Sequence, residues 1–346
     1  MKYSRNQLNK AGNILITSKS DIEVENALDM INKWRANHLH PLRILRNKAL
    51  QLLELNSITP ILVSQRLKRL QSIIYKLDLN ENMGLGGMQD IGGYRIVVKD
   101  VKDLKKLKEL LEHNLSRHRL ERVVNYIITP KESGYRSIHF VYKYYSKSEK
   151  YLGLKLELQI RTKLQHNWAT AVETAGLLTN TSLKSSQGSD EWLQFFKIVS
   201  TLFAVKEGLP KMIEHNHLDI KPLMIEYYNL CKKLNVIDNL AALRVSTKHI
   251  ESGNMVGDYY ILRINVKEKN VKIRAYNKNE FEKATNEYAL FEKEIIDGEN
   301  AVVLVSAISI IALRKAYPSY FLDTSDFIQT LEKMNQNCKE RGYLEY

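Results

Sequence analysis

The chain has 346 residues, of which 44% are hydrophobic and 26% are charged, and it carries a formal net charge of +13. These totals fit a soluble globular protein with room for two domains. The longest apolar run, residues 301–313, is shorter than the roughly 20 residues that cross a bilayer. We therefore expect no membrane-spanning segment.

The cysteine content points to a reducing compartment. Cys231 and Cys338 are the only two cysteines, too few for a disulfide scaffold, and without clustered histidines they do not predict a structural zinc site. The N-terminal residues MKYSRNQLNKAGN lack the apolar core of a signal peptide. Together these features predict a cytoplasmic protein.

The positive charge lies entirely in the first part of the chain. Residues 1–200 hold 32 Lys and Arg against 19 Asp and Glu, whereas residues 201–346 hold 20 of each. Such an asymmetry indicates that the first part binds anions, which could be nucleotides, nucleic acid or both. The alternative is a generally basic surface that aids solubility.

The N-terminal region is predicted to be helical. Over residues 1–55, Asp21 can cap one helix and Pro41 fits the first turn of another. These helices are expected to pack against the rest of the protein and cover it.

A third helix is expected over residues 58–79, where apolar residues recur at near-helical spacing. On that helix Lys68, Ser72 and Lys76 form one row, at positions i, i+4 and i+8. Two ammonium groups with a hydroxyl between them would suit a triphosphate. The alternative is an ordinary solvated basic face.

A glycine-rich loop over residues 81–93 leads into a predicted strand, YRIVV. Its GLGGMQD segment imitates part of a dinucleotide motif, but no strand precedes it and no helix follows, so we reject a Rossmann fold. Asp90 stands just before the strand and Arg95 lies on it. A carboxylate there can hold Mg²⁺, and a guanidinium can bind phosphate or stack on a base.

A helix over about 101–114 and a strand near 119–128 are expected next. After a turn with Pro and Gly, alternation at period two places Tyr135, Ser137 and His139 on one strand face. An exposed tyrosine at a strand start can stack on a purine. The alternative for a lone tyrosine in a sheet is packing.

Strict alternation over residues 151–162 predicts a half-buried strand. Its polar face presents a cation, a carboxylate, an amide and a guanidinium in a row: Lys155, Glu157, Gln159 and Arg161. This face would suit metal-bound polyphosphate, and the alternative is a solvated outer face. A helix over 162–178 is expected to follow.

The C-terminal part is predicted to form a smaller α+β module without a catalytic signature. The expected elements are a long linking helix (218–245), a hairpin (257–277) that turns at residues 268–270, a helix (279–296), a buried strand at AVVLVSA, a helix to about 316, and a final helix capped by Asp323 or Thr324. The module is interpreted as regulatory, as oligomerising or as a neutralising lid, and the alternative is that it only stabilises the fold.

Four motifs in order, KRLQSIIYKL, DIGGYR, PKESGYRSIH and ELQIRT, resemble the synthetase domain of the RelA/SpoT family, the alarmone synthetases. The resemblance covers roughly residues 60–175. It implies an α+β fold with a nucleotidyltransferase-like mixed sheet flanked by helices. It also implies transfer of a pyrophosphate group from ATP to the ribose 3′-hydroxyl of GDP or GTP, with Mg²⁺ as cofactor. The predicted units are a helical cover (1–57), the pyrophosphokinase domain (58–210) and the C-terminal module (211–346).

The resemblance also implies roles for individual residues. Those assigned to the phosphates of ATP are Arg66, Lys68, Ser72, Lys76 and Arg95. Those assigned to the acceptor are Lys131, Tyr135, Ser137, His139 and His166, with Tyr135 stacked on the guanine. The catalytic set is Asp90, Glu157, Gln159 and Arg161. In that set Asp90 is a metal ligand, and Glu157 is a metal ligand or the base for the 3′-hydroxyl.

The sequence departs from the family pattern beside the acceptor pocket. The family often has Asp-Tyr-Ile where this chain has Asn125-Tyr126-Ile127, and Asn where it has Ser133. The identity of the acceptor therefore stays open among GDP, GTP and, as in toxin-like members, the 3′ end of tRNA. A non-catalytic nucleotide- or RNA-binding regulator is a further alternative, which the presence of Asp90 and Glu157 disfavours.

Two further expectations concern the whole protein. The sequence carries no His-Asp pair of the hydrolase type, so no alarmone hydrolase activity is expected, and a homo-oligomer remains open. The spatial expectation is that Asp90, Tyr135 and Glu157 converge on one cleft, with the row from Lys68 to Lys76 facing it.

Overall fold

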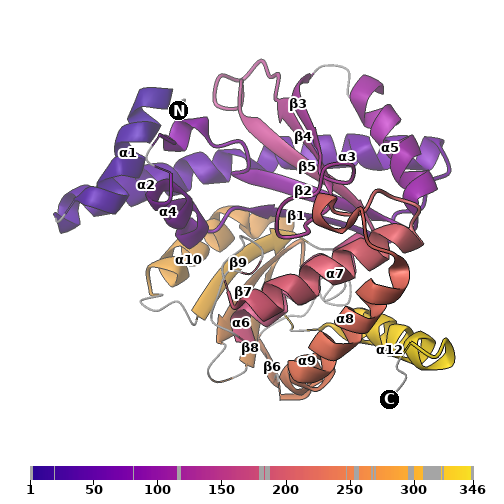
Figure 1. Ribbon diagram of the computed structural model, residues 1–346. Coiled ribbons are helices and arrows are strands. Elements are labelled where there is room, and N and C mark those ends of the chain that lie inside the picture. The colour runs from indigo at the N-terminus through magenta and orange to yellow at the C-terminus, as the bar shows by residue number, and fades with distance from the viewer. Residues whose placement is uncertain are drawn as a thin grey trace.

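A mixed β-sheet flanked by helices forms the architecture of the protein, as the computed structural model in Figure 1 shows. The structure describes the chain except residues 1–2, 19, 81, 115–117, 179–182, 184–187, 247, 253–256, 266–267, 269, 295–299, 307–320, 322 and 344–346. The predicted α+β class, a mixed sheet with flanking helices, is confirmed.

The described strands form a single sheet in the order β3-β4-β5-β2-β1-β9-β7-β8-β6. Their bounds are β1 Leu62–Leu67, β2 Gly92–Val98, β3 Arg119–Asn125, β4 Ile138–Lys143, β5 Lys155–Thr162, β6 Lys248–Ser252, β7 Tyr259–Asn265, β8 Asn270–Tyr276 and β9 Asn300–Ser306. The pairs β2–β5 and β6–β8 are parallel, and the other neighbouring pairs are antiparallel.

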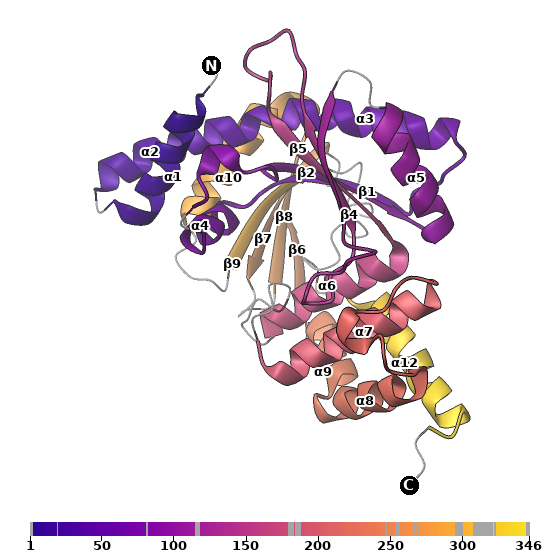
Figure 2. The same ribbon diagram turned by 45° about the horizontal axis from the view of Figure 1, so that its top comes forward.

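The helices gather into groups around this sheet. Their bounds are α1 Arg5–Thr17, α2 Asp21–Asn37, α3 Leu39–Leu55, α4 Leu70–Asp78, α5 Val101–Asn114, α6 Lys163–Leu178, α7 Asp190–Lys206, α8 Ile220–Lys233, α9 Val236–Ser246, α10 Phe281–Lys293 and α12 Ser325–Glu340. Figures 1 and 2 show α1, α2 and α4 together on one side and α6, α7, α8, α9 and α12 together on the other. No helix in the described ranges is long and apolar enough to span a bilayer.

The alternation predicted for residues 151–162 is confirmed in β5. Leu156, Leu158 and Ile160 are fully buried and pack with apolar residues of α3 and α5. The odd-numbered side chains therefore point to the opposite face of the sheet. Arg161 departs from the pattern because it is also buried.

The single helix expected over residues 58–79 is wrong. Residues 62–67 form β1, which pairs along its whole length with β2, and α4 begins only at Leu70. Pairing with β2 overrides the near-helical spacing of the apolar residues, because strand formation depends on cross-strand partners. Lys68 thus precedes the helix, and only Ser72 and Lys76 of the expected row lie on it.

The long linking helix over 218–245 is also wrong, because α8 and α9 are separate. Asn235 lies between them with a φ of 46°, in the left-handed region that asparagine tolerates better than most residues. The helices at 101–114, 162–178 and 279–296 and the antiparallel pairing of the hairpin are confirmed. The helix expected to about 316 lies outside the described residues.

The C-terminal strands continue the sheet of the first part of the chain. Strand β9 pairs with β7 over seven residue pairs and with β1 at Gln65↔Ser306 and Arg66↔Val305. Residues far apart in the sequence are thereby hydrogen-bonded in one sheet. The division of the chain at residues 57 and 210 stays a prediction.

Candidate active site

Three neighbouring strands bring the predicted site residues to one face of the sheet. In the β2–β5 register Gly93 lies opposite Glu157 and Arg95 opposite Gln159, and in the β1–β2 register Arg66 lies opposite Gly93. Paired residues point to the same face of a sheet, so Arg66, Arg95, Glu157 and Gln159 share a face. Arg66 reaches it from a strand and not from the expected helix.

Two lysines hold Asp90 at the start of β2. Lys68 Nζ lies 2.9 Å from Oδ2 of Asp90, and Lys76 Nζ lies 3.3 Å from Oδ1. Burial raises the pKa of Asp90, but the two ammonium groups outweigh it and the pKa falls below its usual value. The carboxylate is therefore ionised at neutral pH. Lys68 and Lys76, which were predicted to bind phosphate, both form ion pairs with Asp90 in this structure.

The carboxylate of Glu157 is held by its neighbours on β4 and β5. Its Oε1 lies 2.8 Å from Nδ1 of His139, and its Oε2 accepts a hydrogen bond of 2.8 Å from Gln159. Burial raises the pKa of Glu157, but the contact with His139 outweighs it, so the pKa is lowered. Glu157 is therefore also ionised, although its side chain is only 17% exposed.

His139 connects Glu157 to the acceptor-side residues. Its Nε2 lies 2.9 Å from the hydroxyl of Tyr135. Burial lowers the pKa of His139, but Tyr135 and Glu157 together raise it above its usual value. His139 and Glu157 thus favour the charged form of each other.

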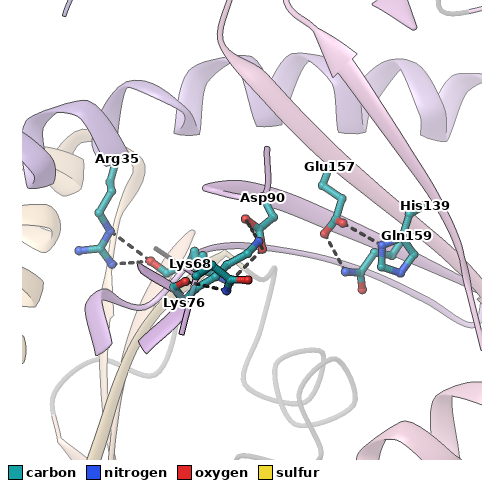
Figure 3. A network of polar contacts seen from close by, with 8 residues as sticks. Arg35, Lys68, Lys76, Asp90, His139, Glu157 and Gln159 are labelled. Carbon is teal, nitrogen blue, oxygen red and sulfur yellow. Dashed lines mark hydrogen bonds and ion pairs between the residues drawn. The ribbon is translucent and has the colours of Figure 1, made fainter. Parts of the chain in front are cut away.

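Asp90 and Glu157 lie near each other, as Figure 3 shows, with the lysine pair beyond Asp90 and His139 beyond Glu157. The charge of Asp90 raises the pKa of Glu157, which is a further sign of proximity. Among the described residues no group of three or more His, Cys, Asp or Glu has the arrangement of a metal site. Two ionised carboxylates nevertheless suit Mg²⁺, which proteins often bind through one or two carboxylates together with substrate phosphates.

The expectation of an exposed Tyr135 is wrong, because its side chain is only 2% exposed. Its ring packs edge-on against Tyr126 and His139. The ammonium of Lys131 lies 4.9 Å from the ring centre of Tyr126 and 5.5 Å from that of Tyr135. An aromatic and cationic group next to His139 is therefore formed by Lys131, Tyr126 and Tyr135. Stacking of Tyr135 on a base stays a prediction.

Ser137 and Asn125 form local contacts near this group. Ser137 is fully buried, and its hydroxyl donates to the carbonyl of Ile160 over 3.1 Å. The side chain of Asn125 accepts from the backbone N–H of Ile127 at 3.1 Å, as is typical of an Asx turn. These contacts join β4 to β5 and shape the turn after β3.

Arg161 and His166 lie together at the end of β5. Arg161 Nη2 donates to Nδ1 of His166 over 2.9 Å, and both side chains are buried. Burial and the nearby charge of Arg95 lower the pKa of Arg161 to about 9, so it remains a cation at neutral pH. Its Nε and Nη1 have no hydrogen-bond partner within the described part of the chain. Buried N–H groups normally have partners, so this guanidinium is suited to a phosphate.

Sequence reasoning missed three residues that position Lys68. Arg35 of α2 donates to the carbonyl of Lys68 through Nε (3.1 Å) and Nη2 (2.7 Å), and it forms an ion pair of 2.7 Å with Glu292 of α10. Glu292 also accepts from the backbone N–H of Leu70 at 2.9 Å. The hydroxyl of Tyr288 accepts from Nη2 of Arg35 and donates to Glu292. Figure 3 shows Arg35 on the far side of the Lys68 backbone from Asp90. No local pattern signals this contact, because Arg35 lies more than two hundred residues from Tyr288 and Glu292.

The comparisons with known proteins agree on one family. A family model described as "Region found in RelA / SpoT proteins" matches residues 65–177. GTP pyrophosphokinase YjbM of Bacillus subtilis (strain 168) is 36% identical over 116 residues, which cover 31% of this chain and 52% of that protein. GTP pyrophosphokinase YwaC of the same organism is 30% identical over 111 residues, covering 30% and 52%. The chain thus spans about half the length of these curated relatives.

Among solved structures, small alarmone synthetase 1 of Bacillus subtilis, bound to its product pppGpp, is 25% identical. The match covers 50% of this chain and 89% of that chain, with a TM-score of 0.42.

Proposed function

We propose that the protein is a pyrophosphokinase of the RelA/SpoT family, because residues 65–177 match the model of the region found in RelA / SpoT proteins. The reaction transfers the β,γ-pyrophosphate of ATP to the ribose 3′-hydroxyl of GTP or GDP. The observation that carries the proposal is the pair of ionised carboxylates, Asp90 and Glu157, on a sheet face that also bears Arg66 and Arg95. Such transfer depends mainly on positioning and on neutralising charge.

The cations of the sheet face would bind the donor. Lys68 and Lys76 stand at the end of the site where α4 begins, and Arg66 and Arg95 stand on β1 and β2. Arg161 adds a buried guanidinium whose Nε and Nη1 have no hydrogen-bond partner among the described residues. Together these groups would orient the triphosphate and stabilise the charge that leaves with AMP.

Asp90 and Glu157 would hold Mg²⁺, whose charge would neutralise the phosphate oxygens during transfer. The lowered pKa of Glu157 bears on its second possible role. A carboxylate with a low pKa is a weak proton acceptor at neutral pH. The environment of Glu157 therefore favours holding the cation and orienting the 3′-hydroxyl over strong general-base catalysis.

The acceptor base would bind at the group formed by Lys131, Tyr126 and Tyr135. Lys131 is exposed, and its ammonium covers the ring of the buried Tyr135. An exposed lysine side chain can move aside, which would open the tyrosine face for stacking on a purine. His139, held by Glu157, would then lie between the base and the reacting ribose.

A transfer assay tests the reaction and its acceptor. The protein would be incubated with Mg²⁺ and γ-labelled ATP, together with GDP, GTP or deacylated tRNA. We expect label on GTP or GDP, and we expect chelation of Mg²⁺ to abolish it. Label on tRNA alone would replace the proposed acceptor. Label on none of the three would favour a non-catalytic nucleotide- or RNA-binding regulator.

The pH dependence of stability tests the pair of His139 and Glu157. Because the pKa of His139 is raised in the folded state, the pair stabilises the fold fully below the unfolded pKa of about 6.5. This contribution is lost as the pH rises through the folded pKa. We therefore expect the free energy of unfolding to fall more from about pH 6 to about pH 9 in the wild type than in His139→Gln. Urea titrations at both pH values measure this, and equal decreases in the two proteins would contradict it.

A further inference from the structure

Helix α7 fixes the path of the chain just before Tyr135. The hydroxyl of Ser200 on α7 donates to the carbonyl of Gly134 over 2.6 Å. Gly134 has a φ of 87°, in the left-handed region that favours glycine. Helix and chain approach so closely there that a Cβ on Gly134 would lie 3.0 Å from the Cβ of Ser200. We name residues 130–135, which include Lys131 and Tyr135, the acceptor turn.

The side chain of Arg136 connects Ser200 to a second turn. Its Nε donates to Oγ of Ser200 over 3.1 Å, and its Nη1 donates to the carbonyl of Ile127 over 2.8 Å. Burial lowers the pKa of Arg136 to about 10, although the charge of Glu207 opposes the fall. Arg136 is therefore a cation at neutral pH, and hydrogen bonds from a charged donor are stronger than neutral ones. These bonds join the turn that bears Tyr126 to the helix that fixes the acceptor turn.

Both turns lack regular secondary structure of their own. Residues 126–137 lie between β3 and β4 and form neither helix nor strand. The group formed by Lys131, Tyr126 and Tyr135 is nevertheless built on this segment. Its geometry therefore depends on contacts from outside the segment, and Ser200 supplies one from beyond residues 65–177, the region that the family model matches.

We propose that Ser200 and Arg136 are positioning residues for the acceptor, because they fix the two turns that carry its binding group. This inference rests on the proposed function and assigns residues that govern binding of the acceptor base. Both side chains are only 3% exposed, so they act through the turns and not by touching the acceptor. A group that is ordered before binding gives tighter binding, since the ligand does not have to order it.

Ser200→Ala tests the inference, because it removes one hydroxyl and both of its hydrogen bonds. We expect the KM for GTP in the transfer assay to rise about tenfold and the KM for ATP to stay unchanged. Fluorescently labelled GDP, titrated in the presence of a non-hydrolysable ATP analogue, should bind about tenfold more weakly. This titration measures acceptor binding without requiring transfer.

Thr201→Val is the matched control, because Thr201 is the next residue of α7 and is also buried. Its hydroxyl is hydrogen-bonded to Nδ1 of His215 at 2.8 Å and not to either turn. We expect this variant to lower the melting temperature as Ser200→Ala does, but to leave both KM values unchanged. Ser200→Cys keeps a weak donor and should give an intermediate KM for GTP. It takes the place of Ser200→Ala if that variant does not fold.

Three results would overturn the inference. The first is an equal rise in the KM for GTP in Ser200→Ala and Thr201→Val, and the second is a parallel rise in the KM for ATP in Ser200→Ala. The third is labelled GDP that does not bind the wild type, or that binds Ser200→Ala equally well. If labelled GDP binds the wild type but no acceptor receives label, the proposed function fails. Weaker GDP binding by Ser200→Ala alone would then still support the positioning role.

Discussion

Glu157→Gln is expected to lower the rate of pyrophosphate transfer by about 10²–10⁴-fold. The amide keeps the shape of the side chain, and its oxygen can still accept from His139, so the fold should be retained. It removes the negative charge that, with Asp90, would hold Mg²⁺ and orient the 3′-hydroxyl. Initial rates at saturating ATP and acceptor, together with a thermal unfolding curve, measure both effects.

Glu112→Gln is the matched control, since Glu112 forms an ion pair with Lys108 on α5, away from the site face. This variant should transfer pyrophosphate at nearly the wild-type rate. If Glu157→Gln retained more than about a tenth of the wild-type rate, the loss would be smaller than removal of a catalytic charge normally causes. The assignment of Glu157 to the reaction would then be wrong.

Glu292→Ala is expected to lower the free energy of unfolding by about 3–5 kcal/mol. The substitution leaves Arg35 as a buried cation without its carboxylate, and it removes the acceptor for the N–H of Leu70. Both effects act where α4 begins, so Lys68 should also lose its fixed position beside Asp90. Urea unfolding measures the stability, and the KM for ATP, which we expect to rise, measures the position of Lys68.

The exposed pair of Arg263 and Glu294 provides the control, because Glu294 directly follows the same helix. Glu294→Ala should cost no more than about 1 kcal/mol, as is usual for a solvated ion pair. If Glu292→Ala proves too unstable to assay, Glu292→Gln keeps an oxygen for Leu70 and isolates the loss of charge. Equal stability losses at positions 292 and 294 would show that the buried pair has no special role.

The site residues that could be predicted are those whose positions follow from the pattern of neighbouring residues in the sequence. Alternation over β5 placed Glu157 and Gln159 on one face, and the position of Asp90 just before a strand was evident from the glycine-rich loop. The predicted convergence of Asp90 and Glu157 is supported by their proximity in Figure 3. These features depend on periodicity and on turn chemistry, which are local.

Features that depend on distant partners could not be predicted. Residues 62–67 have helical spacing, yet they form a strand because β2 and β9 lie on either side of it. Tyr135 is buried because Tyr126, Lys131 and His139 surround it. Arg35 has no sequence signal at all, since its carboxylate partner comes from α10. In each case the deciding contact is formed by tertiary packing, which periodicity does not encode.

The pairing of β1 with β9 in the sheet has a consequence for protein synthesis. Strand β1 leaves the ribosome early, but the strand that covers its second edge begins only at Asn300. At roughly 5–20 residues per second, this interval lasts tens of seconds. During that time the nascent chain presents an uncovered edge strand, the kind of surface on which chains pair wrongly. Conditions that slow elongation between residues 67 and 300 are therefore expected to increase aggregation of the newly made protein.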